Sequence, residues 1–205
     1  MATLLQLSRL IDRFSEFIGR WIAWLVLAAV LISAINAAVR KAFNTSSNAY
    51  LEIQWYLFAA VFLLAAGYTM LRQGHVKIDV ISSKLSKRKQ IWIDILGFTF
   101  FLMPMCLVIL YYGIPFFLQG FRSGEMSSNA GGLIRWPVYI CIPIGFSLLL
   151  LQGLSELIKR VAFLRGLIPD PTEKVREKTP EEELAEEVRR QAEELERAAA
   201  AARKA

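Results

Sequence analysis

The sequence predicts an all-α membrane protein with four transmembrane helices, an amphipathic N-terminal helix and a charged C-terminal helix. Apolar residues make up 55% of the 205-residue chain and aromatic residues 12%, which is high for a soluble domain. The apolar residues gather in four long runs. At about 1.5 Å per residue, a helix of about 20 residues crosses the hydrocarbon core of a bilayer. The predicted spans cover residues 21–39, 51–71, 91–112 and 136–158.

Tryptophans mark the ends of these runs. Amphipathic rings favour the depth of the lipid headgroups, so an aromatic belt near the span ends is typical of membrane helices. All five tryptophans follow this rule: Trp21, Trp24, Trp55, Trp92 and Trp136. Four core helices of a soluble protein are the alternative, and four runs of this length with so few charges argue against it.

Residues 1–20 precede the first span and form a separate amphipathic segment. Apolar residues recur there at helical spacing, opposite a charged face: Leu4, Leu7, Ile11, Phe14 and Ile18 against Arg9, Asp12, Arg13, Glu16 and Arg20. We expect a helix that lies along the membrane surface and continues into the first span. A cleavable signal peptide would have a shorter apolar core, so retention is favoured. The small residues at 34–38 leave cleavage open as the alternative.

The second span carries polar residues only at its two ends. Glu52 and Trp55 lie at its start, and Arg72 follows its end, with no ionisable residue between. This layout suits a subunit that is held in place better than one that moves an ion through its own middle. Two interpretations of Glu52 remain open. It is either a solvated acid favoured by the helix dipole or a contact to a partner chain.

His75 and Asp79 follow the second span. They are four residues apart, so in a helix they would share a face and allow a carboxylate–imidazole contact. The alternative is an amphipathic segment at the membrane surface, with Val76, Ile78 and Val80 towards lipid or protein.

Charge predicts the orientation. The connection between the second and third spans holds six basic residues: Arg72, Lys77, Lys84, Lys87, Arg88 and Lys89. The connection from Gly113 to Arg135 holds two, Arg122 and Arg135. The positive-inside rule places the middle connection in the cytoplasm, and an even number of spans places both termini there. The net charge of +6 is explained by this orientation, so nucleic acid is not implied as a partner.

The four spans form a membrane domain at residues 21–160, and the tail at 161–205 differs from it in character. Thr179, Pro180 and Glu182 are typical of a helix start, and a thin, Ala-rich apolar stripe follows. The predicted tail helix is either a docking helix or a solvated helix without a partner. Near the ends of their spans, Asp94 and Glu156 are expected to pair with neighbouring basic residues.

The sequence lacks the residue patterns that several kinds of active or metal site require. Cys106 and Cys141 lie in different spans without metal-ligand spacing, and we expect both to act as small apolar residues. The single histidine excludes paired axial haem ligands, and no glycine-rich phosphate loop occurs. We therefore predict no catalytic residue, no cofactor and no metal site, and a protein that is not an enzyme.

Motifs in the second and fourth spans resemble a known family. They are Glu52-Ile53-Gln54-Trp55, Ala65-Ala66-Gly67-Tyr68, Arg72 with His75-Val76-Lys77-Ile78-Asp79, Trp136-Pro137, and Pro143-Ile144-Gly145. With four spans at this spacing, residues 10 to 160 resemble the small integral membrane subunit, DctQ-like, of tripartite ATP-independent periplasmic (TRAP) transporters. The tail after Pro169 is not part of the family pattern.

The resemblance implies a secondary transporter of three parts in the bacterial inner membrane. A periplasmic solute-binding protein captures a solute, usually a carboxylate, and a large permease subunit carries it inward with sodium. The small subunit is implied to be a fixed scaffold that contacts the large permease and membrane lipids. The residues expected to make such contacts are Glu52, Trp55, Arg72, His75, Asp79 and Trp136.

Two alternatives from other classes stay open. One is an autonomous four-span exporter coupled to protons, which would use Glu52 as its proton site and would need that residue deeper in the membrane. The other is a membrane assembly factor without transport activity. The transported solute and the stoichiometry cannot be inferred from this chain.

Overall fold

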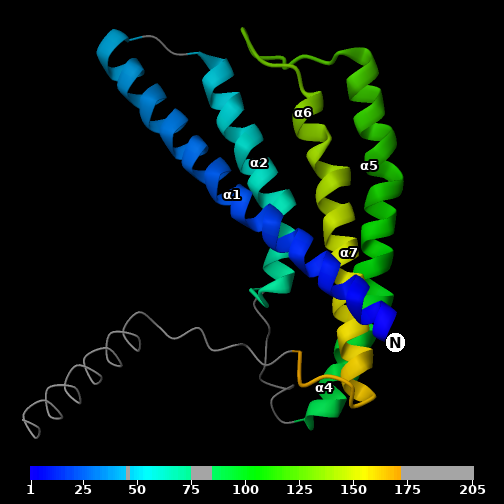
Figure 1. Ribbon diagram of the computed structural model, residues 1–205. Helices are drawn as coiled ribbons and strands as arrows, with labels where there is room; N and C mark the ends of the chain where they lie inside the picture. Colours follow the sequence, from blue (N-terminus) through cyan, green and yellow to red (C-terminus); the bar gives the residue numbers. More distant parts are fainter. Residues whose placement is uncertain (45–46, 75–84, 172–205) are drawn as a thin grey trace, which may run out of the picture. The chain divides into compact units, whose positions relative to one another are not determined.

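The computed structural model describes residues 1–44, 47–74 and 85–171. Its elements are α1 (Ala2–Phe43), α2 (Asn48–Leu71), α4 (Lys87–Gly97), the π-helical turn η1 (Phe98–Leu102), α5 (Met103–Ser123), α6 (Trp136–Tyr139) and α7 (Cys141–Leu164) (Figure 1). Four stretches are long and apolar enough to cross a membrane: Ala2–Phe43, Asn48–Leu71, Lys87–Ser123 and Trp136–Leu164. The predicted all-α fold with four spans is confirmed.

Helix α1 joins the predicted surface segment and the first span without a break. Its buried residues are Ser8, Ile11, Ser15 and Ile22, a face that includes two serines. The apolar residues on its other faces are exposed, including Leu7, Leu10, Phe14 and Phe17. The side of α1 that carries the two serines therefore packs against the protein, whereas Arg9, Arg13 and Arg20 are exposed and the apolar side is left for lipid or a partner. The position of residues 1–20 along the membrane surface stays a prediction.

Helix α7 is the centre of the bundle. In its apolar stretch 39% of residues are buried, against 6–11% in the other three spans. It contacts α1, α2, α4 and α5, and α5 runs beside it along most of its length (Figure 1). Because the other spans each pack mainly on α7 or on a neighbour, they keep broad exposed apolar faces.

Glycines let α2 and α7 approach closely. A Cβ atom added at Gly145 would lie 2.6 Å from the backbone oxygen of Leu63, and one at Gly67 would lie 3.1 Å from that of Leu148. Close contact through small residues is a common way for membrane helices to associate, because van der Waals packing replaces the missing hydrophobic driving force.

The helix of the third span continues past residue 112, the end of the predicted span. We expected it to end near residue 112, with Gly113 opening a connection, but α5 continues to Ser123. Gly113 and Gly120 are buried, and Cβ atoms there would meet Ile142 and Tyr139. These glycines are therefore packing positions and not loop positions. Pro115 lies inside the helix, which membrane helices tolerate.

A π-helical turn keeps one side of the third span against α7. The residues that face α7 are Asp94, Phe98, Leu102 and Cys106, each four positions after the last. In a regular α-helix these twelve positions would turn by about 1200°, roughly 120° beyond three full turns. A π turn absorbs one extra residue, about 100° of this excess. The contacts to α7 thus explain why η1 interrupts the α-helix.

The two chain ends of the membrane domain lie at the same end of the bundle. The guanidinium of Arg165, just after α7, lies 3.9 Å from the sulfur of Met1. The connections around Asn48 and Ala130 meet at the opposite end, where the Asn48 amide donates to the Ala130 carbonyl at 3.0 Å. The predicted tail helix beginning near Thr179 lies outside the described residues.

Candidate functional site

At one end of the bundle, the start of α2 holds the connection between α5 and α6. The Glu52 carboxylate accepts hydrogen bonds from the Ser127 hydroxyl, from the Asn129 amide at 2.8 Å and from the Leu133 backbone N–H at 2.7 Å. Only 3% of Glu52 is exposed. We call these four residues the Glu52 cluster.

Two more residues on the same face of α2 extend this anchor. Asn48 and Tyr56 precede and follow Glu52 by one helical turn, so all three lie on one face. The Tyr56 hydroxyl donates to the Ile134 carbonyl at 3.2 Å. An isolated antiparallel bridge joins Met126 and Ile134. One helix face therefore fixes the course of the whole connection from residue 124 to residue 135.

Of the two interpretations of Glu52, the solvated acid does not agree with the structure. The connection folds over the carboxylate and supplies three donors. Burial of a carboxylate is tolerated when hydrogen bonds replace its water. The alternative interpretation, a contact of Glu52 with a partner chain, stays a prediction.

An ion pair closes the base of this connection. The Arg135 guanidinium lies 3.0 Å from the Glu125 carboxylate, to which the Tyr139 hydroxyl also donates at 3.1 Å. Hydrogen bonding with Tyr139, and then the proximity of Glu125, raise the pKa of Arg135 above its usual range. The guanidinium thus stays charged at any physiological pH.

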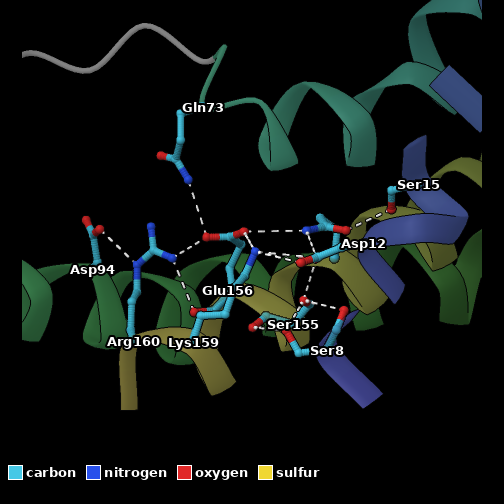
Figure 2. A network of polar contacts seen from close by, with 10 residues as sticks. Ser8, Asp12, Ser15, Gln73, Asp94, Ser155, Glu156, Lys159 and Arg160 are labelled. Atoms are coloured by element: carbon cyan, nitrogen blue, oxygen red, sulfur yellow. Dashed lines mark hydrogen bonds and ion pairs between the residues drawn. The ribbon is translucent and has the colours of Figure 1, made fainter. Parts of the chain in front are cut away.

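At the other end of the bundle, α7 carries a polar network that reaches α1, α4 and Gln73, two residues after α2 (Figure 2). At its centre is Glu156, which is 1% exposed. Its carboxylate pairs with Lys159 and Arg160 and accepts from the amides of Gln152 at 3.4 Å and Gln73 at 3.3 Å. We call this set the α7 network. Its members are Ser8, Asp12, Ser15, Gln73, Asp94, Gln152, Ser155, Glu156, Lys159 and Arg160.

Asp12 joins α1 to this network. Its carboxylate accepts from the Ser155 hydroxyl at 2.7 Å and the Gln152 amide at 3.0 Å, and it pairs with Lys159 at 3.2 Å. Ser8 and Ser15 of α1 each make a further hydrogen bond of 2.7 Å to α7. Ser8 bonds to the Ser155 hydroxyl and Ser15 to the Gln152 side chain. Ser8, Asp12 and Ser15 therefore form an interface between α1 and α7, whereas Arg9, Arg13 and Arg20 are exposed.

Arg160 joins α4 to the network. The side chain is fully buried, pairs with Asp94 at 2.9 Å and with Glu156, and stacks on the Phe98 ring at 4.5 Å. These pairs confirm the prediction that Asp94 and Glu156 pair with basic residues near the span ends. A buried guanidinium needs such partners, because an unpaired buried charge is costly. Its Nη2 atom has no hydrogen-bond partner in the described part of the chain.

Nearly the whole length of α2 separates the Glu52 cluster from the α7 network, because Glu52 lies at the start of this helix and Gln73 lies just after its end. Arg72 follows Glu52 by 20 residues along α2, and Glu156 follows Trp136 by 20 residues along α6 and α7. Twenty helical residues rise by about 30 Å, the thickness of a bilayer core. Between these levels the spans hold no acidic residue, basic residue or histidine.

The structure does not bring the predicted contact residues into one site. Trp55 is exposed at the Glu52 end, where Trp136 packs edge-on against Phe121 at 5.5 Å. Arg72 lies at the other end, 3.7 Å from Glu16. His75 and Asp79 lie outside the described residues.

Sequence reasoning missed most of the α7 network. On α7 its residues recur at positions 152, 155, 156, 159 and 160, a helical spacing that could have identified a polar face. On α1 the signal was Ser8, Asp12 and Ser15. Within the described ranges, no group of histidine, cysteine and acidic residues could hold a metal ion.

The fold and these two polar levels define a multi-pass membrane protein whose polar contacts lie at the span ends. A family model for the DctQ component of tripartite ATP-independent periplasmic transporters matches residues 29–163. The chain therefore belongs to the DctQ family, the small permease subunits of TRAP transporters. No curated protein and no solved structure matches it.

Proposed function

We propose that this chain is a stationary scaffold for the large permease subunit in sodium-driven uptake of a solute, with a carboxylate as the expected class. A periplasmic solute-binding protein would deliver the solute. The observation that supports this role most is the absence of acidic residues, basic residues and histidine from the middle of all four spans. Transport sites usually display such groups at mid-membrane, because their cost is tolerated only where function needs them.

The ionisable groups near the span ends also favour a static role. Glu156 and Arg160 pair with each other and with neighbouring residues of the same chain, and Glu52 anchors its own connection. Glu52 was the proton site of the exporter alternative. A carboxylate held by three donors at a helix start supports anchoring better than proton exchange.

The orientation follows from charge. The α7 network end holds Arg72 and Lys87–Lys89, and by the positive-inside rule it faces the cytoplasm of a bacterial cell with both termini. The Glu52 cluster then faces the periplasm. Exposed apolar faces on α1 and α5 would contact the large permease or lipid, and Trp55, Arg72, His75, Asp79 and Trp136 remain the proposed contact residues.

Reconstitution tests this role. Proteoliposomes would contain this chain alone, the large permease with its binding protein, or all three. We expect sodium-driven uptake only from the complete set. Uptake by this chain alone, or full uptake without it, would contradict the scaffold role.

A further inference from the structure

A hollow lies on the face of α5 near its end at the Glu52 cluster. Five residues line it, all on α5, and its volume is about 580 Å³. They are Pro115, Leu118, Gln119, Arg122 and Ser123. The spacing of these positions places them on one side of the helix.

The lining changes from apolar to polar along the helix. Pro115 and Leu118 lie towards the middle of the span, and Gln119, Arg122 and Ser123 lie towards its end. The connection held by Glu52 begins one residue later, at Gly124. The polar part of the hollow thus belongs to the level of the Glu52 cluster, where the bilayer core ends.

The polar part can donate hydrogen bonds and carries a positive charge. Arg122 and Gln119 are exposed. Within the described part of the chain, Arg122 has no acidic partner, whereas Arg135 pairs with Glu125. A guanidinium binds phosphate oxygens well, because its donors match their geometry. An amide one turn away adds another donor.

We propose that this hollow binds one phospholipid, with the phosphodiester at Arg122 and Gln119 and an acyl chain along Leu118 and Pro115. The polar residues of the hollow lie at the end of the span and the apolar residues lie towards its middle, as the headgroup and acyl chains of a lipid do. A free phosphate would make no favourable contact with the apolar residues, so a lipid is favoured. The site is independent of the proposed scaffold function, since it lies within this chain.

Native mass spectrometry of the purified full-length chain tests the site. Phosphatidylglycerol would be added to detergent-solubilised protein, with diacylglycerol as the arm that lacks a phosphate. We expect one retained phosphatidylglycerol and no retained diacylglycerol. Arg122→Gln should lower retention about fivefold, the effect of one cationic contact at a lipid surface.

Arg40→Gln is the matched control, because Arg40 is also an exposed arginine near the same end of the bundle. It should leave retention unchanged. Equal retention in the Arg122→Gln variant and the natural chain, or equal loss in both variants, would overturn the proposal. If Arg122→Gln does not fold, Gln119→Leu replaces it and should also retain less phosphatidylglycerol than the natural chain. Unchanged retention in Gln119→Leu would then overturn the proposal.

Two further experiments distinguish a bound lipid from other occupants of the hollow. Displacement of the lipid by glycerol 3-phosphate would indicate a free phosphate site and contradict the proposal. In the assembled transporter, a cysteine in place of Ser123 should not cross-link to the large permease. Efficient cross-linking would show that protein covers the hollow.

Discussion

The close approach of α2 and α7 at Gly145 predicts that a larger residue there destabilises the chain. In Gly145→Ala the new methyl group would lie 2.6 Å from the Leu63 backbone oxygen, whereas ordinary contact begins at 3.4 Å. The two backbones must therefore separate by about 0.8 Å, because neither can rotate away. Overpacking of this kind costs about 1–3 kcal/mol. Gly145→Ala should destabilise the chain by that amount.

Gly97→Ala is the matched control. Nothing lies within 4 Å of a Cβ atom added at Gly97, which is also helical. Alanine is favoured over glycine in a helix by about 0.8–1.0 kcal/mol, so this variant should be slightly more stable. The two variants should differ by about 2–4 kcal/mol in the free energy of unfolding.

Unfolding of the purified chain in mixed micelles measures both variants. Dodecyl sulfate would be titrated into a mild detergent, and loss of helix would be followed by circular dichroism. Equal stabilities, or a larger loss for Gly97→Ala, would refute the packing of α2 on α7 described above.

Three further outcomes are expected. A cysteine replacing Ser128 should be labelled from the periplasm, and one replacing Ser86 should be labelled only after permeabilisation. Labelling of position 86 in intact cells would contradict the predicted orientation. Deletion of Phe100, exposed in η1, should convert the π turn into regular α-helix and leave α4 in register with α7, because eleven steps from Asp94 to Cys106 turn by only about 20° beyond three full turns; a large loss of thermal stability would contradict the register argument. His75→Ala combined with Asp79→Ala should reduce co-purification of the large permease, and an unchanged yield would remove these residues as contacts.

The spans could be predicted because their signal is local. A run of apolar residues of sufficient length suffices, and tertiary contacts are not needed to identify it. The end of the third span could not be predicted in this way. Gly113, Pro115 and Gly120 are loop signals in a soluble chain. The structure shows that they belong to a helix, in which the two glycines pack against Ile142 of α7 and Tyr139 of α6.

The polar contacts could be predicted only in part. Asp94 and Glu156 were expected to find basic partners, and Arg160 and Lys159 supply them. The role of Asp12 was missed because the charged face of an amphipathic helix was assigned to water. Part of that face instead meets α7, because residues of the same chain supply hydrogen bonds to Asp12, while Arg9, Arg13 and Arg20 are exposed.

Glu52 shows a different limit. Its donors come from residues 75 to 81 positions later in the chain. Neither periodicity nor motif spacing relates positions so far apart. The sequence could place this acid at a span end but could not show that its own chain would cover it.

The central claim is that this chain supplies no ligand to the coupling sodium or to the solute. The most direct test is the sodium dependence of uptake by the complete transporter carrying Glu52→Gln, Asp94→Asn or Glu156→Gln. Each substitution should lower the amount of assembled complex and hence the maximal rate, because it weakens contacts that hold the helices or their connection. The sodium concentration at half-maximal uptake should stay unchanged in all three. A large shift in that concentration for any of them would contradict the scaffold role.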